Sequence, residues 1–455
     1  MQTLRKIILD QALTPSGWRS DVGIDIDDGV IVSIIPDASP QDRERVSGIA
    51  LPGLPNLHSH TFQRAMAGLA ETRGPSADSF WTWREVMYHF LGNLTPEDIE
   101  AIAAYAFMEM LEGGFTSVAE FHYLHHDIGG RPYADLAEAS RRIAAAAAAT
   151  GINLTLLPVF YAQGGFGAQP PTSGQARFIN DPERFARLVE GARDAVRGLP
   201  VARLGIAPHS LRAVTPESLR DVVALAGDGP IHMHISEQVK EVEDCLAWSG
   251  KRPVAWLMDA CEIDADWCLI HATHLDEGEV AAIARSRAVA GLCPLTEASL
   301  GDGIFRGQDF IAHGGHYGVG TDSNIEITAF GELKQLEYAQ RLGLRARNVM
   351  AGDEGRSTGR QLYEAACAGG AQALSLPLGT LAEGMRADFV VLDDAHPDLA
   401  CVSGDRWLDL AIFAIGKAAI REVHVGGERV VENGRHHARP ATQARYMRTL
   451  KRLTA

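Results

Sequence analysis

The stretch that decides the fold is residues 51–64, LPGLPNLHSHTFQR, an apolar run that ends in a His-x-His pair. Successive side chains of an extended strand alternate between two faces, so His58 and His60 are expected to point the same way at the end of the run. Two imidazoles on one face are half of a metal site. Core histidines with satisfied nitrogens would give the same local pattern, so the rest of the chain has to decide between these interpretations.

Further strand-like runs follow this one and alternate with helical sequence such as PEDIEAIAAYAFMEMLEGG. They are FTSVAEFHY, INLTLLPVFY, RLGIAPHS, IHMHISE, WCLIHATH, AVAGLCP and HYGVGTDS. Together with the first run they predict a (β/α)8 TIM-like barrel over residues 51–385, whose active site lies at the carboxyl ends of the strands. Residues 1–50 and 386–455 read as short strands and tight turns, and we expect them to form one small β-sandwich domain built from both termini.

The predicted strand ends carry residues that bind metals. A catalytic zinc ion takes about three or four His, Asp or Glu ligands and keeps a position for water. We assign His58, His60, His234 in HMHISEQ and Asp322 in GVGTDSN as the ligands of one divalent metal, with zinc as the default. Iron, manganese and nickel also accept such ligands, so the sequence leaves the metal open. His232 lies on the same strand face as His234 but one layer further from the strand end, and we expect it to pack in the barrel or to support the ligands.

The same strand ends carry candidate proton carriers. Coordination to Zn²⁺ lowers the pKa of water from 15.7 to roughly 7. Asp322 is then the group that orients this water and takes its proton, His271 the group that hydrogen-bonds the reacting centre, and Glu237 the shuttle that hands a proton to a leaving nitrogen. Each has a simpler alternative: Glu237 could begin a helix, Asp322 could cap one, and His274 competes with His271.

Composition limits the partners. The chain has 42 Lys+Arg against 58 Asp+Glu, a net charge of -16, without a basic cluster, so a nucleic-acid partner is not expected. It lacks the roughly 20 consecutive apolar residues of a membrane span. The six cysteines form no Cys-x-x-Cys pair and the N-terminus lacks the apolar core of a signal peptide, which predicts a reduced, cytoplasmic protein.

In their order, these motifs resemble the amidohydrolase superfamily over nearly the whole chain. The matched positions are His-x-His on the first strand, His-x-x-Glu on the fifth, a His on the sixth and an Asp on the eighth. In similar binuclear members a carboxylated lysine bridges two metals, and LLPVFY and IAPHS offer no lysine, so the resemblance implies one metal per subunit. Among similar mononuclear members, the His-x-x-Glu of the fifth strand goes with deamination.

Several donors near the predicted site suit an anionic substrate. Gln63, Tyr123, His209 and Arg212 follow strand ends, and a guanidinium matches a carboxylate with two parallel hydrogen bonds. They favour an acyclic dicarboxylate that bears an imine as the small-molecule substrate. Arg84, in a loop FWTWREVMY expected to close over the pocket, could meet a carboxylate from its own or a neighbouring subunit, or could simply pack there.

The strings NLHSHTFQRAMAG, EFHYLHH, HMHISEQ and GVGTDSN resemble one family of that superfamily, the formiminoglutamate deiminases. The resemblance implies hydrolysis of N-formimino-L-glutamate to N-formyl-L-glutamate and ammonia in histidine degradation, and a homodimer. The main alternative is a deaminase of an aromatic heterocycle, such as guanine or an adenosine derivative. A relative that has lost catalysis is a second alternative, although this chain keeps every residue that the chemistry needs.

Overall fold

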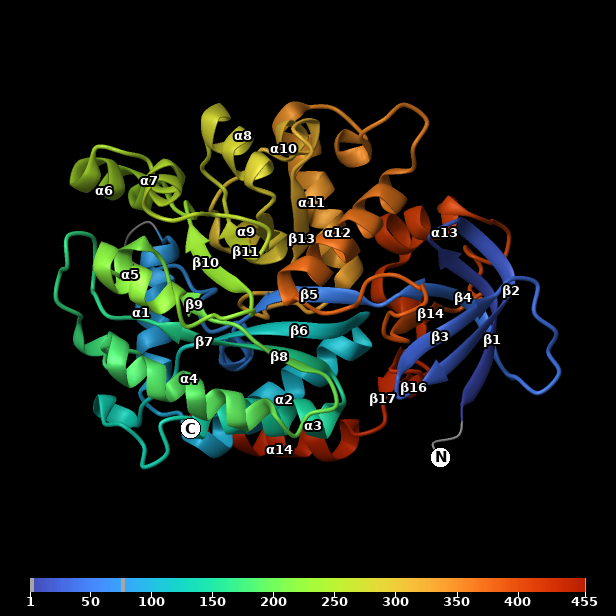
Figure 1. Ribbon diagram of the computed structural model, residues 1–455, viewed down its shortest axis with the longest axis horizontal. Helices are drawn as coiled ribbons and strands as arrows, with labels where there is room; N and C mark the ends of the chain where they lie inside the picture. The colour runs from blue at the N-terminus through green and yellow to red at the C-terminus, as the bar shows by residue number, and fades with distance from the viewer. Residues whose placement is uncertain (1–3, 75–77, 455) are drawn as a thin grey trace.

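A parallel barrel forms the centre of the molecule, in a computed structural model that describes residues 4–74 and 78–454 (Figure 1). Its strands are β5 (Leu54–Ser59), β6 (Phe115–His122), β7 (Asn153–Phe160), β8 (Ala202–Leu204), β9 (Ala207–Pro208), β10 (Ile231–Ile235), β11 (Trp267–His271), β12 (Val289–Leu292) and β13 (His316–Val319). The predicted run RLGIAPHS is split into β8 and β9, which both pair with β7. The TIM-like barrel predicted from the sequence is therefore the fold.

Backbone hydrogen bonds close the barrel at two seams. At the first seam the His234 amide donates to the His209 carbonyl at 3.0 Å, which joins the end of the fourth strand to β10. At the second the Asp322 amide donates to the His58 carbonyl at 3.0 Å, and the His60 amide donates to the Asp322 carbonyl at 2.9 Å. The chain thus brings Asp322 beside the His-x-His pair through main-chain bonds alone.

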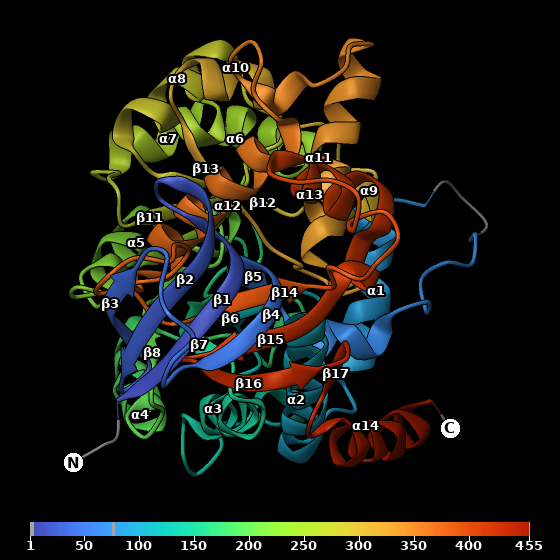
Figure 2. The same ribbon diagram turned by 90° about the vertical axis from the view of Figure 1, so that its right-hand side faces the viewer.

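Helices cover the outside of the barrel (Figures 1 and 2). They are α1 (Phe80–Leu91), α2 (Pro96–Glu112), α3 (Glu138–Thr150), α4 (Pro182–Val196), α5 (Pro216–Val223), α6 (Val239–Ser249), α7 (Pro253–Ala260), α8 (Glu277–Ser286), α9 (Pro294–Leu300), α10 (Gly307–Ala312), α11 (Ala329–Leu344), α12 (Thr358–Leu374), α13 (Asp405–Leu410) and α14 (Arg439–Leu453). Among the described residues, none of these helices is long and apolar enough to cross a membrane.

The aromatic segment 80–88, predicted as a loop, lies in helix α1 instead. Ser79 and Thr82 form a capping box at its start, which satisfies backbone donors of the first turn. The buried residues Phe80, Met87 and Leu91 recur at helical spacing, so one face of the segment packs on the barrel. Arg84 is therefore carried by a helix, which fixes its direction better than a loop would.

The two ends of the chain build one eight-stranded sheet beside the barrel (Figure 2). Its order is β17-β16-β15-β14-β4-β1-β2-β3, from β1 (Arg5–Thr14), β2 (Gly17–Asp27), β3 (Val30–Ile35), β4 (Glu44–Pro52), β14 (Phe389–Leu392), β15 (Ile420–Val425), β16 (Glu428–Glu432) and β17 (Arg435–His436). The sheet curls back on itself. The Ile31 amide of its edge strand β3 donates to the Met385 carbonyl at 2.8 Å, close to the start of β14 in the middle of the sheet. This is the predicted small β domain from both termini.

The last helix leaves that sheet and packs on the barrel side. The Tyr446 ring of α14 stacks on the Tyr105 ring of α2 with centroids 4.0 Å apart. Arg439 forms an ion pair with the buried Glu112 at 2.5 Å. The C-terminal residues thus tie the small sheet to helix α2.

Candidate active site

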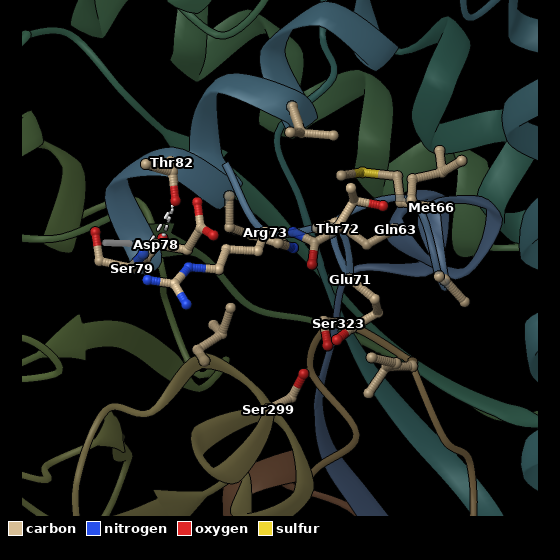
Figure 3. A pocket seen from close by; sticks show the side chains of 18 residues that line it. Gln63, Met66, Glu71, Thr72, Arg73, Asp78, Ser79, Thr82, Ser299 and Ser323 are labelled. Atoms are coloured by element: carbon tan, nitrogen blue, oxygen red, sulfur yellow. Dashed lines mark hydrogen bonds between the residues drawn. The ribbon is translucent and has the colours of Figure 1, made fainter. Parts of the chain in front are cut away.

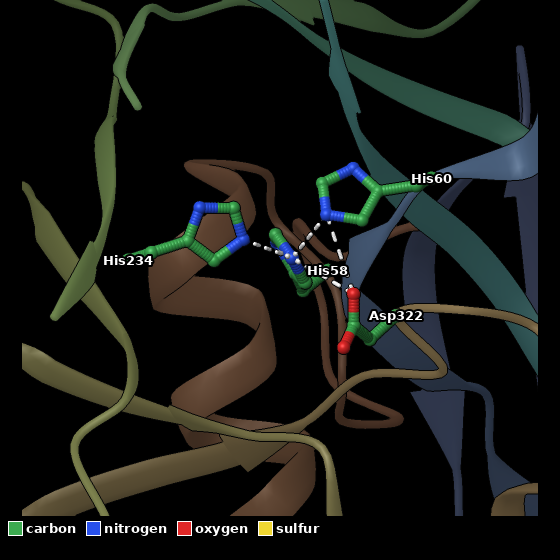
Figure 4. Close-up of side chains that lie close together, drawn as sticks. All are labelled: His58, His60, His234 and Asp322. Atoms are coloured by element: carbon green, nitrogen blue, oxygen red, sulfur yellow. Dashed lines mark hydrogen bonds and ion pairs between the residues drawn. The ribbon is translucent and has the colours of Figure 1, made fainter. Parts of the chain in front are cut away.

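Four side chains of the ligand type meet at the carboxyl ends of the barrel strands (Figure 4). His58 and His60 come from β5 and the loop after it, His234 comes from β10, and Asp322 follows β13. All four are buried, and their ligand atoms lie within 4.8 Å of one another. The structure thus brings together the four residues that the sequence assigns to one metal.

The ring nitrogens of this cluster are arranged for a cation. The Nε2 atom of His58 lies 3.2 Å from Nε2 of His60 and 3.1 Å from Nε2 of His234. The Nδ1 atoms of His60 and His234 face the carbonyl oxygens of Phe121 and His209, at 2.9 and 3.1 Å. Each Nδ1 therefore carries the ring proton, and each Nε2 presents a lone pair to the centre.

The spacing of these atoms also fits a metal. Two nitrogens about 2.0–2.1 Å from a tetrahedral zinc ion are about 3.3 Å apart. The Oδ1 atom of Asp322 completes the set, 3.5 Å from Nε2 of His58 and 3.3 Å from Nε2 of His60. Burial lowers the pKa of His58 to about 3, so this imidazole is neutral at pH 7. A neutral imidazole is the form that binds a metal.

His271 lies beside the cluster between three carboxylates. Its Nε2 atom is 3.8 Å from Glu237 Oε1 and 3.9 Å from Asp322 Oδ2, and its Nδ1 atom is 3.3 Å from Glu297 Oε1. Burial alone lowers the pKa of His271, but the carboxylates of Glu237, Asp322 and Glu297 raise it to about 10. The competing residue His274 instead faces the Asp302 carbonyl at 2.8 Å.

Glu297 is a residue of the site that the sequence reasoning missed. The seventh predicted strand, AVAGLCP, ends at Cys293 and Pro294 and carries no carboxylate or imidazole at its end. Glu297 stands one helical turn further, in α9, and its buried carboxylate turns back to Cys293 and His271. In the sequence Glu297 is only a glutamate five residues after the end of β12, and a glutamate in a first helical turn is common in ordinary helices.

Glu237 lies on the Nε2 side of His271, opposite Glu297. Its position is fixed by the backbone turn that precedes it. Burial raises the pKa of Glu237 to about 7. The preceding Ser236 has a φ of 54°, in the left-handed region. The carboxylate of Glu241 accepts hydrogen bonds from the Ser236 and Glu237 amides at 3.1 and 3.2 Å, which stabilises this turn. Glu237 thus lies two residues before the start of α6, and its side chain lines the pocket at the carboxyl ends of the strands.

A pocket opens directly over the four-residue cluster. It is lined by His60, Gln63, Phe80, Trp83, Arg84, Met87, Tyr88, Tyr123, Tyr161, Phe178, His209, Arg212, His234, Glu237, His271, Leu300 and Asp322. All five predicted substrate contacts are in this set. The Gln63 amide nitrogen donates to the Tyr123 hydroxyl at 3.0 Å, whereas its oxygen is buried and has no hydrogen-bond partner among the residues that the structure describes. Arg64, next in sequence, points away and pairs with Glu109 at 2.6 Å.

Two guanidinium groups face this pocket. The Cζ atoms of Arg84 and Arg212 lie 4.5 and 5.6 Å from the centroid of the Trp81 ring. Their Nε atoms are buried without a hydrogen-bond partner, and neither residue forms an ion pair within residues 4–74 and 78–454. Arg84 reaches the pocket of its own chain. In a protein with a net charge of -16, this is a local concentration of positive charge.

A wider cavity of about 370 Å³ adjoins the pocket and shares Gln63, Trp83 and Leu300 with it (Figure 3). The charged side chains in its lining are Glu71, Arg73 and Asp78, which are of mixed sign. None of the four ligand-type residues lines it. The chemistry of the site is therefore confined to the inner pocket.

Comparisons with known proteins agree with this architecture. The sequence profile described as "Amidohydrolase family" matches residues 49–430, and that of "Formimidoylglutamate deiminase HutF, N-terminal domain" matches residues 5–48. Formimidoylglutamate deiminase of Pseudomonas aeruginosa is 52% identical over 98% of this chain and 99% of its own. A 5-methylthioadenosine/S-adenosylhomocysteine deaminase of Natronomonas pharaonis is 28% identical over 95% of this chain and 93% of its own.

Solved structures give the same result. An amidohydrolase from Brucella melitensis has a TM-score of 0.95 and 53% identity, over 99% of this chain and all of its own. A zinc-bound adenosine deaminase from Xanthomonas campestris shares the fold alone, with a TM-score of 0.81 and 22% identity over 99% of this chain and 98% of its own. The chain belongs to the amidohydrolase family and, within it, to the formimidoylglutamate deiminases.

Proposed function

We propose that this protein hydrolyses N-formimino-L-glutamate to N-formyl-L-glutamate and ammonia, in histidine degradation. One observation carries the proposal: two guanidinium groups without an ion-pair partner among the described residues face the pocket that lies over the four ligand-type residues. The 52% identity to a formimidoylglutamate deiminase supports the same reaction.

The pocket has the donors that a dicarboxylate needs. Arg212 is buried and Arg84 is half-buried. A guanidinium removed from water is stabilised by an anionic partner, so both residues favour anionic groups on the ligand. Each guanidinium can bind one carboxylate with two parallel hydrogen bonds. His209 and the Tyr123 hydroxyl lie in the same lining and offer further polar contacts. We propose Gln63, Arg84, Tyr123, His209 and Arg212 as the substrate-binding residues.

We further propose that His58, His60, His234 and Asp322 hold one divalent ion, most simply zinc. When bound, such an ion makes water acidic enough to lose a proton near neutral pH and polarises the group under attack. Asp322 orients the water and accepts its proton, while His271 hydrogen-bonds the reacting centre. Zinc is favoured by the spacing of the Nε2 atoms, and metal analysis of the purified protein tests its identity.

Glu237 is the proposed proton carrier. Its buried carboxyl group, with a pKa of about 7, can both accept and release a proton near neutral pH. Water adds to the formimino carbon, the bond from this carbon to the terminal nitrogen breaks, and the proton delivered by Glu237 leaves with ammonia. Because the substrate carboxylates anchor the glutamate end at the arginines, the terminal nitrogen is the one that lies beside Glu237.

A comparison of substrates tests the proposal. Ammonia release is measured with N-formimino-L-glutamate, guanine, adenosine and 5′-methylthioadenosine, the last because relatives at 28% identity are named as deaminases of that nucleoside. We expect turnover of the formimino compound alone. Turnover of the purines alone would establish the aromatic-heterocycle alternative instead.

Assembly and location complete the proposal. We propose a homodimer, from the resemblance to the family, and a cytoplasmic location, from the unpaired cysteine pattern of the sequence. Light scattering on the purified protein and fractionation of the source cells measure these two properties.

A further inference from the structure

The ring of His271 is held at a strained position on the chain. His271 ends β11 with a φ of 68°, and the following Ala272 has a φ of 49°. Left-handed backbone at residues with a β-carbon costs free energy and persists only where the surroundings impose it. The backbone that carries this imidazole is therefore held in place by its surroundings.

Glu297 is the neighbour that contacts the Nδ1 side of the ring. A single carboxylate oxygen, Oε1, lies 3.3 Å from Nδ1 of His271 and accepts a hydrogen bond from the Cys293 amide at 2.8 Å. The side chain of Glu297 is 7% exposed. Since Cys293 directly follows β12, the carboxylate is anchored to the barrel itself and is a rigid partner for the ring.

We propose that Glu297 is a positioning residue for His271. By accepting a hydrogen bond from the Nδ1–H group, the Glu297 carboxylate fixes the plane of the His271 ring. The Nε2 atom is then the nitrogen that faces Glu237 and Asp322. The contribution of His271 to the reaction then depends on a residue that does not touch the substrate pocket, since Glu297 is absent from its lining. The inference rests on the proposed function where it concerns turnover, and on geometry alone where it concerns the ring.

A neighbouring helix offers a matched control. Glu332, in α11, is also buried, and its Oε2 atom accepts a hydrogen bond from the Leu295 amide of α9 at 2.9 Å. Within the described part of the chain, no hydrogen bond or ion pair links Glu332 to His271. Replacing Glu332 therefore removes a buried carboxylate that supports α9 but leaves the contact with His271 in place.

Steady-state kinetics of the metal-loaded enzyme test the proposal. For Glu297→Leu we expect kcat for N-formimino-L-glutamate to fall by about 10- to 100-fold, the usual effect of losing such a supporting contact, with KM and metal content unchanged. Glu297→Gln should recover most of kcat, because its amide oxygen can accept both hydrogen bonds. Glu332→Leu should keep kcat near the wild-type value. Should Glu297→Leu fail to fold, Glu297→Asp serves, because its shorter side chain cannot reach Nδ1.

A second measurement does not depend on turnover. In protein labelled with ¹⁵N-histidine, the Nδ1–H signal of His271, assigned with His271→Asn, should be present in wild type and Glu297→Gln and lost in Glu297→Leu. An unchanged Nδ1–H signal, or equal losses of kcat in Glu297→Leu and Glu332→Leu, would overturn the proposal. A wild-type enzyme that releases no ammonia from N-formimino-L-glutamate would overturn the proposed function, and the NMR signal would still decide the role of Glu297.

Discussion

Arg84 and Arg212 share one aromatic neighbour, since the Cζ atoms of both lie within 5.6 Å of the centroid of the Trp81 ring. They come from helix α1 and from the short turn after the fourth barrel strand, two segments far apart in the sequence. Within the described residues neither guanidinium forms an ion pair, although, against the effect of burial, the carboxylates of Glu241 and Glu237 are near enough to raise the pKa of Arg212. This relationship supports the proposed substrate, which has two carboxylates.

Removing one of these arginines should weaken substrate binding selectively. For Arg212→Ala we expect a rise in KM for N-formimino-L-glutamate that corresponds to about 2 to 4 kcal/mol, since one carboxylate loses its buried partner. Arg64→Ala is the control, because that guanidinium pairs with Glu109 outside the pocket. An unchanged KM in Arg212→Ala would place the carboxylate site elsewhere.

Trp81 should affect binding through the two arginines. Cation–π contacts are worth about 0.5 to 2 kcal/mol, so Trp81→Leu should raise KM by a moderate factor while kcat stays nearly constant. Trp248→Leu is the matched control, since its ring packs against Phe166 and, in the described part of the chain, no arginine lies over it. The effect of Trp81→Leu should shrink when Arg84 is already methionine. An undiminished effect in that background would show that Trp81 acts through packing alone.

Metal binding and proton transfer should separate in two variants. Glu237→Gln is expected to retain the metal and lose turnover, because the amide can neither accept nor release the proton. His234→Ala is expected to lose metal as well, because it removes one of the three clustered Nε2 atoms. Metal content by elemental analysis and ammonia release are measured on the same preparations. Full turnover by Glu237→Gln would refute its role as carrier.

The stability of the protein should depend on pH through Glu120, which accepts hydrogen bonds from the amide and hydroxyl of Thr61. Burial raises the pKa of Glu120 from 4.5 to about 7. Between these values the folded protein keeps a proton that the unfolded chain releases, so this contribution to the free energy of unfolding falls as pH rises, by at most about 1.4 kcal/mol per pH unit.

Glu120→Gln should remove that slope, because its amide oxygen can still accept both hydrogen bonds and does not titrate. Urea unfolding at pH 5, 6 and 7 gives the comparison, and only the difference between the two proteins is used, since other groups titrate in both. Parallel pH dependences in the wild type and the variant would contradict the assignment.

The barrel and the cluster of four candidate metal ligands could be predicted because each ligand stands in a short motif at the end of one strand. His58 and His60 share a strand face, and His234 and Asp322 each follow a recognisable strand, so a closed barrel brings them together. The β domain was predictable from alternation and turn residues at both ends. The family resemblance then placed Gln63, Tyr123, His209 and Arg212 in one pocket.

Other features depend on contacts that a sequence does not display. Residues 80–88 were predicted as a loop because their aromatic content hides the helical spacing of Phe80, Met87 and Leu91. Glu297 looks like any glutamate of a first helical turn until the fold sets it against His271. His436, close to the C-terminal end of the chain, is buried and its Nε2 atom faces the Thr150 carbonyl at 2.9 Å. The contacts of Glu297 and His436 are made with residues of other segments, His271 and Thr150, which only the folded chain brings near.

The most direct test of the central claim follows the formimino carbon itself. N-formimino-L-glutamate labelled with ¹³C at that carbon is incubated with the metal-loaded enzyme in H₂¹⁸O, and the products are identified by ¹³C NMR and mass spectrometry. The account predicts N-formyl-L-glutamate with ¹⁸O in the formyl group and one equivalent of ammonia. Formation of formamide and free glutamate, or no conversion at all, would contradict it.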